Sequence, residues 1–170
     1  MTTETYQRYQ AAYATQSDIQ HHLGLLFSLA HGNVLELGTR GGVSTMALLA
    51  GVERRGGHVT SVDIEDCSGV LPAHDQWTFV QGDSRDPVLP TRLFKNFDLI
   101  LIDTEHTYEM ASAELGLWWP YLNAGGVICM HDIVTFPGVG RAAREFAAKM
   151  GWPITCVLPC HGMAVIARPE

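Results

Sequence analysis

The stretch Val34-Leu35-Glu36-Leu37-Gly38-Thr39-Arg40-Gly41-Gly42-Val43-Ser44-Thr45 decides the fold of this chain. A short apolar run breaks at Gly38 into a glycine-rich turn, and a helical pattern follows from Val43. Strand, tight loop and helix N-terminus form a unit in which backbone N–H groups face one ligand. The dehydrogenase fingerprint G-x-G-x-x-G is absent, because positions 40 and 43 are not glycines. Glu36, two residues before the first glycine, favours an ammonium or ribose hydroxyl as partner and would repel a pyrophosphate.

Composition and charge limit the classes to which the chain can belong. It has 170 residues, 46% of them hydrophobic and 17% charged, as expected for one soluble globular domain. The net charge of −7 argues against nucleic acid as a partner. The sequence has no apolar stretch of membrane-spanning length and no secretory signal, so we expect a cytoplasmic protein without a membrane partner. The four cysteines are expected to be free thiols, with a weak metal-site alternative at Cys156, Cys160 and His161.

Hydrophobic periodicity predicts alternating strands and helices after residue 16. A capping box, Ser17-x-x-Gln20, opens a predicted helix over 17–30, on which His21 and His22 are expected at the surface. Only four residues join the last two strands, too few for a parallel crossover. The predicted fold is therefore a doubly wound, Rossmann-like α/β sheet of about seven strands, mostly parallel with a C-terminal antiparallel hairpin. The predicted strands are 34–37, 58–63, 76–80, 97–103, 127–130, 154–158 and 163–167, and the other predicted helices are 43–50, 91–95, 108–122 and 139–150.

Residues 1–16 are predicted to form an N-terminal arm, and residues 17–170 a single domain. The arm carries three tyrosines but no clear core periodicity. It can be a loose segment or one that folds over the active site. No internal repeat or linker indicates a further domain.

Carboxylates gather where the predicted strands end. The carboxyl ends of parallel strands share one edge of the sheet, where ligands bind in open α/β folds. Like charges at one edge cost stability unless they bind something. Asp63 lies 25 residues after Gly38, which fits the acid that binds a ribose in nucleotide-binding α/β folds. The strand-end carboxylates are Glu36, Asp63, Asp103 and Asp132, and Asp83 follows the third strand.

The opening stretch resembles the first motif of class I S-adenosylmethionine-dependent methyltransferases, an acidic residue followed by spaced glycines. It is most similar to the small bacterial group related to macrolide-sugar O-methyltransferases and cephalosporin-hydroxylase-like proteins. The resemblance runs from about residue 33 to residue 168, and the turn at Asp83-Ser84 resembles that family's adenine-contacting turn. The resemblance implies S-adenosylmethionine as the cofactor, bound by Glu36, Gly38, Thr39, Gly42, Ser44, Asp63, Asp83 and Ser84.

Two later segments, 103–109 and 130–133, resemble a motif pair of the same family. In its metal-dependent members the aspartate of the first motif and an acidic pair after the fifth strand hold magnesium, and the histidine of the first motif is the proposed base. The resemblance implies His106 and Asp103 as catalytic residues, and Asp103, His131 and Asp132 as metal ligands. Because an imidazole replaces the first acid of the pair, we expect Mg²⁺ or another divalent metal. An imidazole pKa near 6.5 suits a base at neutral pH.

The expected function is S-adenosylmethionine-dependent methyl transfer, with O-methylation of a sugar, phenol or secondary metabolite as the leading reaction and metal assistance left open. A nucleic-acid methyltransferase is disfavoured, because residues 103–106 lack the Asp/Asn-Pro-Pro-Tyr/Phe motif and no basic patch is present. The alternatives are a non-catalytic nucleotide-binding protein and an oxygenase-like relative on the same fold. The expected partner is a small-molecule acceptor, and a homo-oligomer is compatible with the sequence.

Overall fold

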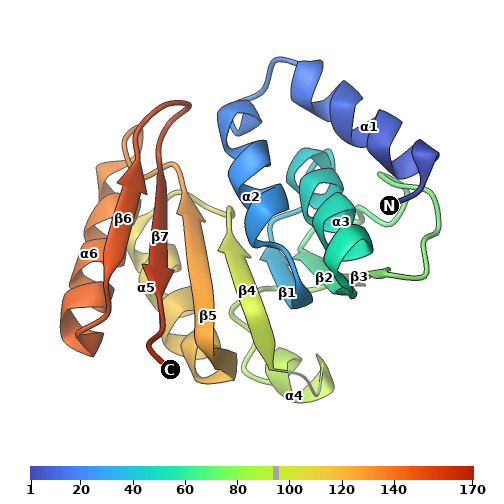
Figure 1. Ribbon diagram of the computed structural model, residues 1–170. Coiled ribbons are helices and arrows are strands. Elements are labelled where there is room, and N and C mark those ends of the chain that lie inside the picture. Colours follow the sequence, from blue (N-terminus) through green and yellow to red (C-terminus); the bar gives the residue numbers. More distant parts are fainter. Residues whose placement is uncertain (94–95) are drawn as a thin grey trace.

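Seven strands form one mixed sheet with the order β3-β2-β1-β4-β5-β7-β6 (Figure 1). The computed structural model describes residues 1–93 and 96–170. The pairs β5–β7 and β6–β7 are antiparallel and the other neighbours are parallel, so the predicted doubly wound sheet with a C-terminal hairpin is confirmed. The strands are β1 (Gly32–Leu37), β2 (Gly57–Asp63), β3 (Trp77–Gln81), β4 (Phe97–Ile102), β5 (Leu122–His131), β6 (Ile154–Val157) and β7 (Met163–Ala167).

Helices cover both faces of this sheet. α2 and α3 pack on one face, and α5 and α6 pack on the other (Figure 1). The helix predicted over 91–95 corresponds to α4, and positions 94 and 95 lie outside the described residues. Within the described residues, no helix is long and apolar enough to cross a membrane. The helices are α1 (Thr3–Ala14), η1 (Gln20–His22), α2 (Leu23–Leu29), α3 (Val43–Arg55), α4 (Leu89–Leu93), α5 (Tyr108–Trp118), η2 (Trp119–Tyr121) and α6 (Pro137–Met150).

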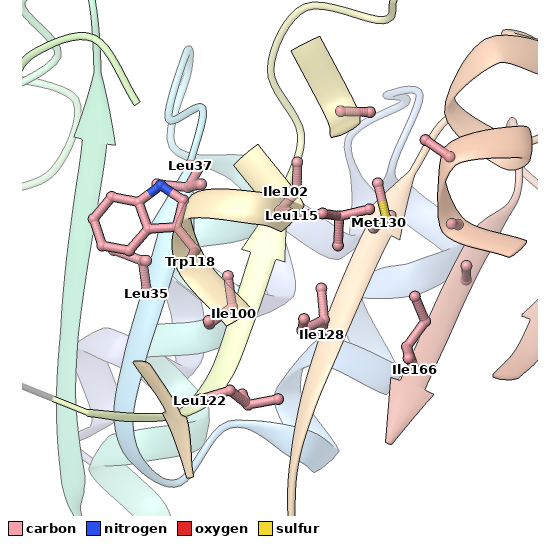
Figure 2. Packing of buried hydrophobic residues seen from close by; sticks show 14 of the residues in the cluster. Leu35, Leu37, Ile100, Ile102, Leu115, Trp118, Leu122, Ile128, Met130 and Ile166 are labelled. Atoms are coloured by element: carbon pink, nitrogen blue, oxygen red, sulfur yellow. The ribbon is translucent and has the colours of Figure 1, made fainter. Parts of the chain in front are cut away.

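The central strand β4 shows why the core has two parts. Successive side chains of a strand point to opposite faces of the sheet. Ile100 and Ile102 therefore pack in one cluster with Trp118 of α5, as Figure 2 shows. Leu99 and Leu101 belong to the other cluster, which includes side chains of α2 and α3. Because both faces are covered, the strand reads in the sequence as an almost continuous apolar run.

The N-terminal residues form a helix, α1, that packs against α3. The loose-arm alternative is therefore wrong. Thr2 caps the helix, because its hydroxyl accepts a hydrogen bond from the backbone N–H of Thr5 at 3.1 Å. The ring of Tyr9 stacks on that of Phe27 in α2, with 5.1 Å between the ring centroids. Ala12 and Tyr9 pack against the core cluster that includes side chains of α2 and α3, so a few contacts rather than a buried apolar stripe hold this helix.

The helix predicted from Ser17 begins later than expected, at Leu23, after the short turn η1. Ser17 does not cap it: the Ser17 hydroxyl is buried and has no hydrogen-bond partner among the described residues. Asp18 forms an ion pair with Arg40 of the glycine loop, with 3.2 Å between Oδ2 and Nη1. The next residue, Ile19, is buried in the core cluster that includes side chains of α2 and α3.

Candidate active site

The loop between β1 and α3 requires glycine where the backbone turns. Gly38 has a φ of +90°, and a Cβ at this position would collide with the backbone carbonyl oxygen of Asp103. Gly42, with a φ of +74°, is the N-cap of α3. Gly38 thus lets the loop lie directly against the residue that follows β4. The first and fourth strands therefore present their carboxyl ends to the same space.

Asp63, the last residue of β2, braces this loop. Its Oδ2 accepts hydrogen bonds from the backbone N–H groups of Thr39 at 2.8 Å and Arg40 at 3.0 Å, and its Oδ1 accepts one from Glu65 at 3.0 Å. Burial alone would raise the pKa of Asp63, but these hydrogen bonds lower it below its usual range. Asp63 is therefore a fixed carboxylate at the base of the loop.

Glu36 lies beneath the loop and is fully buried. Its carboxylate accepts hydrogen bonds from the hydroxyl groups of Ser44 at 2.6 Å, Thr45 at 2.7 Å and Ser61 at 2.6 Å. Burial raises the pKa of Glu36 to about 7, although the three hydroxyl groups act in the opposite direction. In this position the carboxyl group joins β1 to both β2 and α3.

Two adjoining cavities open at the carboxyl edge of the sheet. The larger has a volume of about 280 Å³, and Asp63, Asp83 and Ser84 are among its lining residues. The smaller has a volume of about 170 Å³ and is lined by Thr39 and Ser44, among others. Glu36 and Gly42 are the predicted binding residues that line neither of these two cavities in the described part of the chain. Four residues line both cavities and so connect them: Gly38, Arg40, Asp103 and Thr104.

A buried carboxyl group on α5, that of Glu114, supports the larger cavity. It accepts hydrogen bonds from the hydroxyl of Ser84 at 2.5 Å and from that of Thr104 at 2.9 and 2.8 Å. Burial raises the pKa of Glu114 to about 7. Asp83 forms an ion pair with Arg85 at 2.8 Å on the exposed side of the same turn. The polar groups of the turn thus already have protein partners.

Three histidines surround Asp132, which directly follows β5. Asp132 Oδ2 lies 2.8 Å from His106 Nε2 and 3.2 Å from His131 Nδ1, and Oδ1 lies 3.2 Å from His161 Nδ1. Asp103 Oδ1, at the end of β4, lies 3.2 Å from His131 Nδ1 and 3.6 Å from His106 Nε2. The structure therefore brings together the four residues expected to serve in catalysis and metal binding.

His131 is held between the two carboxylates and a backbone carbonyl. Its Nε2 lies 3.0 Å from the carbonyl oxygen of Cys160, which can only accept, so Nε2 carries a proton. Burial alone would lower the pKa of His131, but the hydrogen bond to Asp103 and the charges of Asp103 and Asp132 raise it to about 9. Burial would likewise raise the pKa of Asp103, but His106 and His131 lower it to about 2. The two carboxylates thus favour one positive charge at Nδ1.

His106 lines the smaller cavity, next to Asp103. Its ring stacks on Phe136, with 4.4 Å between centroids and 23° between planes. The carboxylate of Asp103, and after it that of Asp132, raises the pKa of His106 above its usual range, although burial acts in the opposite direction. His106 can act as a base only in its neutral form. Because its pKa is raised, His106 becomes neutral at a higher pH than an unperturbed histidine does.

The donor atoms at the strand ends fit a divalent cation. Asp103, His131 and Asp132 form a group, among the described residues, whose ligand atoms lie within 4.8 Å of one another. Atoms that share a metal ion at usual bond lengths lie about 3 Å apart, and both carboxylates are 3.2 Å from His131 Nδ1. Metal-bound histidines commonly donate their other N–H to a carbonyl, as His131 does to Cys160. The residues therefore suit a metal with oxygen and nitrogen ligands.

The strand order and the cavities at the carboxyl edge define a Rossmann-like methyltransferase fold. A family model described as a methyltransferase domain matches residues 35–133, more than half of the chain. The chain belongs to this methyltransferase-domain family. The match gives no support to the two alternative functions, which are a non-catalytic nucleotide-binding protein and an oxygenase-like relative. No curated protein sequence matches the chain.

Three solved structures share the fold over almost the whole chain. A protein from Staphylococcus aureus, described as a candidate caffeoyl-CoA O-methyltransferase, is 14% identical with a TM-score of 0.74, and the match covers 99% of this chain and 93% of that one. MycE, a methyltransferase of the mycinamycin biosynthetic pathway in complex with Mg and SAH, is 20% identical with a TM-score of 0.69; the match covers 99% of this chain but only 54% of MycE. CalS11, a TDP-rhamnose 3′-O-methyltransferase of calicheamicin biosynthesis, is 16% identical with a TM-score of 0.68, at 99% and 94% coverage. At these identities the likeness concerns the fold.

Three residues at the site have roles that the sequence does not indicate. His22, expected at the surface, is fully buried, and its Nε2 lies 3.1 Å from the carbonyl oxygen of Cys160. His161 contacts Asp132, and Glu114 holds the floor of the larger cavity. No local pattern signals these contacts, because each joins segments far apart in the chain.

Proposed function

We propose that the protein transfers the methyl group of S-adenosylmethionine to a hydroxyl group of a small molecule. The observation that carries the proposal is the connection of the two cavities, the smaller of which is lined by His106 and Asp103. Together their volumes fall in the range of roughly 300–1,000 Å³ of small-molecule sites. A cofactor lying across both cavities would present its methyl group beside a base.

The polar groups of the cavities support this position of the cofactor. Asp63, whose carboxylate lines the larger cavity, would face the ribose hydroxyls of the cofactor there. In the smaller cavity, the hydroxyl groups of Ser17 and Thr39 are buried without a hydrogen-bond partner in the described part of the chain. Unpaired buried hydroxyls are unfavourable, and the charged amino-acid end of the cofactor would satisfy them.

The side chains at the end of the smaller cavity supply the chemistry. His106 takes the proton of the acceptor hydroxyl while the oxygen of that hydroxyl attacks the methyl carbon of the cofactor. The carbon–sulfur bond breaks, and the products are a methyl ether, S-adenosylhomocysteine and a proton on His106. Asp132, at 2.8 Å, and Asp103, at 3.6 Å, orient the imidazole and stabilise its protonated form. The sulfonium is already activated, so the chain needs only to align the reactants and remove a proton.

A divalent metal would add Lewis acidity to this site. Asp103, His131 and Asp132 are the residues that would hold it, and when bound it would lower the pKa of the acceptor hydroxyl. MycE, which shares the fold, is described in complex with Mg and SAH. That description, together with the donor set in this chain, supports metal assistance by Mg²⁺ or another divalent ion.

The acceptor is proposed to be a sugar, a phenol or a similar metabolite. The side chains of Val134 and Phe136 are exposed in the loop after β5, and Phe136 contacts the base. They offer an apolar surface to one face of a small molecule. The net charge of −7 does not favour a nucleic-acid acceptor.

Transfer of a radiolabelled methyl group from S-adenosylmethionine tests this function. The acceptors are phenols and sugars, each paired with a control compound in which the hydroxyl is already methylated. We expect labelled ether from free hydroxyl compounds and none from their methylated partners. Transfer to amine or thiol analogues in place of the hydroxyl compounds would contradict the proposed reaction.

A further inference from the structure

We infer that the site takes a first-row transition metal ion in preference to Mg²⁺, and that His131 makes this selection. The inference rests on the proposed function, in which Asp103, His131 and Asp132 hold a metal. Its basis is the position of His131 Nδ1, which lies 3.2 Å from Asp103 Oδ1 and 3.2 Å from Asp132 Oδ2.

The backbone decides which nitrogen of His131 faces the carboxylates as a ligand. The carbonyl oxygen of Cys160 lies 3.0 Å from His131 Nε2 and 3.1 Å from His22 Nε2. A carbonyl has two lone pairs and no proton, so both rings must donate to it. The neutral His131 ring then has its lone pair on Nδ1. This lone pair and the two carboxylates point to one place, an arrangement that a cation stabilises.

The His131 ring has no freedom to leave this position. Its side chain has no exposed surface, and the ring of His22, also buried, lies 5.4 Å away edge-on. Cys160 has a φ of +47°, and the turn that it begins is tied to the loop after β5 by the hydrogen bond from the Val134 N–H to the His161 carbonyl at 2.8 Å. A metal bound by Asp103 and Asp132 would therefore meet an imidazole nitrogen where a carboxylate oxygen or a water would otherwise bind.

Candidate metals differ in how strongly they bind an imidazole nitrogen such as His131 Nδ1. Mg²⁺ prefers hard oxygen ligands and gains little from imidazole. Imidazole suits transition metals such as Fe, Ni, Cu and Zn, and affinity at mixed nitrogen and oxygen sites rises from Mn²⁺ through Fe²⁺ and Co²⁺. One fixed imidazole beside two carboxylates should therefore make Co²⁺ bind more tightly than Mg²⁺.

Calorimetric titration of the metal-free protein with Co²⁺ and with Mg²⁺ measures the preference. His131→Asp converts the donor set to oxygen only, and we expect it to lower the Co²⁺-to-Mg²⁺ affinity ratio at least tenfold. His31→Asn removes an exposed histidine outside the site and should keep the wild-type ratio. Mg²⁺ binding as tight as Co²⁺ binding, or an equal loss of preference in both variants, would overturn the assignment.

If His131→Asp does not fold, a measurement on the wild-type chain can still test whether His131 is a metal ligand. Pulsed electron paramagnetic resonance of protein-bound Mn²⁺ should show coupling to an imidazole nitrogen, and its absence would refute the inference. Binding of S-adenosylhomocysteine to the metal-free protein is measured in parallel. If S-adenosylhomocysteine binds but neither Co²⁺ nor Mn²⁺ does, the proposed metal preference is wrong and the proposed function stands. If the product does not bind, the proposed function fails whatever the metals do.

Discussion

The backbone of Asp132 has a conformation that residues other than glycine rarely adopt, and this conformation positions the carboxylate. Its φ is +64°, in the left-handed region, and only 2% of the residue is exposed. Such conformations persist where the surrounding structure enforces them, and they gather at functional sites. Here the conformation places one carboxylate against His106, His131 and His161. A single residue thus orients both the proposed base and the proposed metal ligand.

His106 is expected to be the base, and His106→Gln tests this role. Glutamine can still donate to Asp132 but cannot take a proton at neutral pH, so kcat should fall by about 10²- to 10⁴-fold. Affinity for S-adenosylhomocysteine should not change. In the wild type the neutral form is active and its pKa is raised, so the rate should increase with pH through a midpoint above 6.5. A variant with the wild-type kcat and pH profile would show that His106 is not the base.

Gly38 is expected to be indispensable to the loop between β1 and α3. In Gly38→Ala the new methyl group meets the carbonyl oxygen of Asp103 at a positive φ, so the variant should lose about 1–3 kcal/mol of stability. Gly41→Ala is the matched control, because a Cβ there meets no atom of the described residues within 4 Å. Urea denaturation of both variants checks the expectation. Equal stabilities would mean that the loop can shift without loss.

Among the secondary-structure elements, β1, β2 and α3 are joined through the carboxyl group of Glu36. Its pKa rises from 4.5 to about 7 on folding, so the folded chain holds this proton more tightly than the unfolded chain does. The contribution to stability is complete below about pH 4.5 and is lost as the pH rises to 7. The loss amounts to roughly 3 kcal/mol.

Glu36→Gln removes this ionisation and keeps polar atoms for the three hydroxyl groups. When the pH rises from 5 to 8, the free energy of unfolding should fall in the wild type. In the variant this fall should be smaller by roughly 2–3 kcal/mol. Urea denaturation at the two pH values measures the difference. Glu109→Gln, at an exposed position of α5, is the control and should follow the wild type. A Glu36→Gln variant with the wild-type pH dependence would show that the carboxyl group does not titrate in this range.

The strands could be predicted from the sequence better than the N-terminal helices. β4 is recognisable because burial on both faces demands an apolar run. The helix expected from Ser17 begins only at Leu23, after a segment in which Ile19 is buried in the core, so tertiary packing overrides the local capping pattern. α1 escaped prediction because Thr5 is its one buried residue among those described, so it has no apolar stripe to find.

At the scale of the whole molecule, the parallel sheet explains why part of the site could be foreseen. Asp63, Asp103 and Asp132 end or follow strands that run in the same direction, so their convergence follows from topology alone. The contacts of His22 could not be foreseen. His22 reaches the carbonyl of Cys160, in the turn between β6 and β7, across 138 positions of sequence, and no periodicity encodes that contact.

Calorimetric titration with S-adenosylhomocysteine measures whether the two connected cavities bind the cofactor, as we propose. The wild type should bind one equivalent. Asp63→Ala removes the carboxylate that braces the loop and is proposed to bind the ribose, and should weaken binding by about 1.5–3 kcal/mol, or roughly 10- to 150-fold. Asp66→Ala, which removes an exposed carboxylate that accepts from the Ser68 N–H, should bind as the wild type does. Absence of binding to the wild type, or equal affinity of the Asp63→Ala variant, would show that these cavities do not bind the cofactor as proposed.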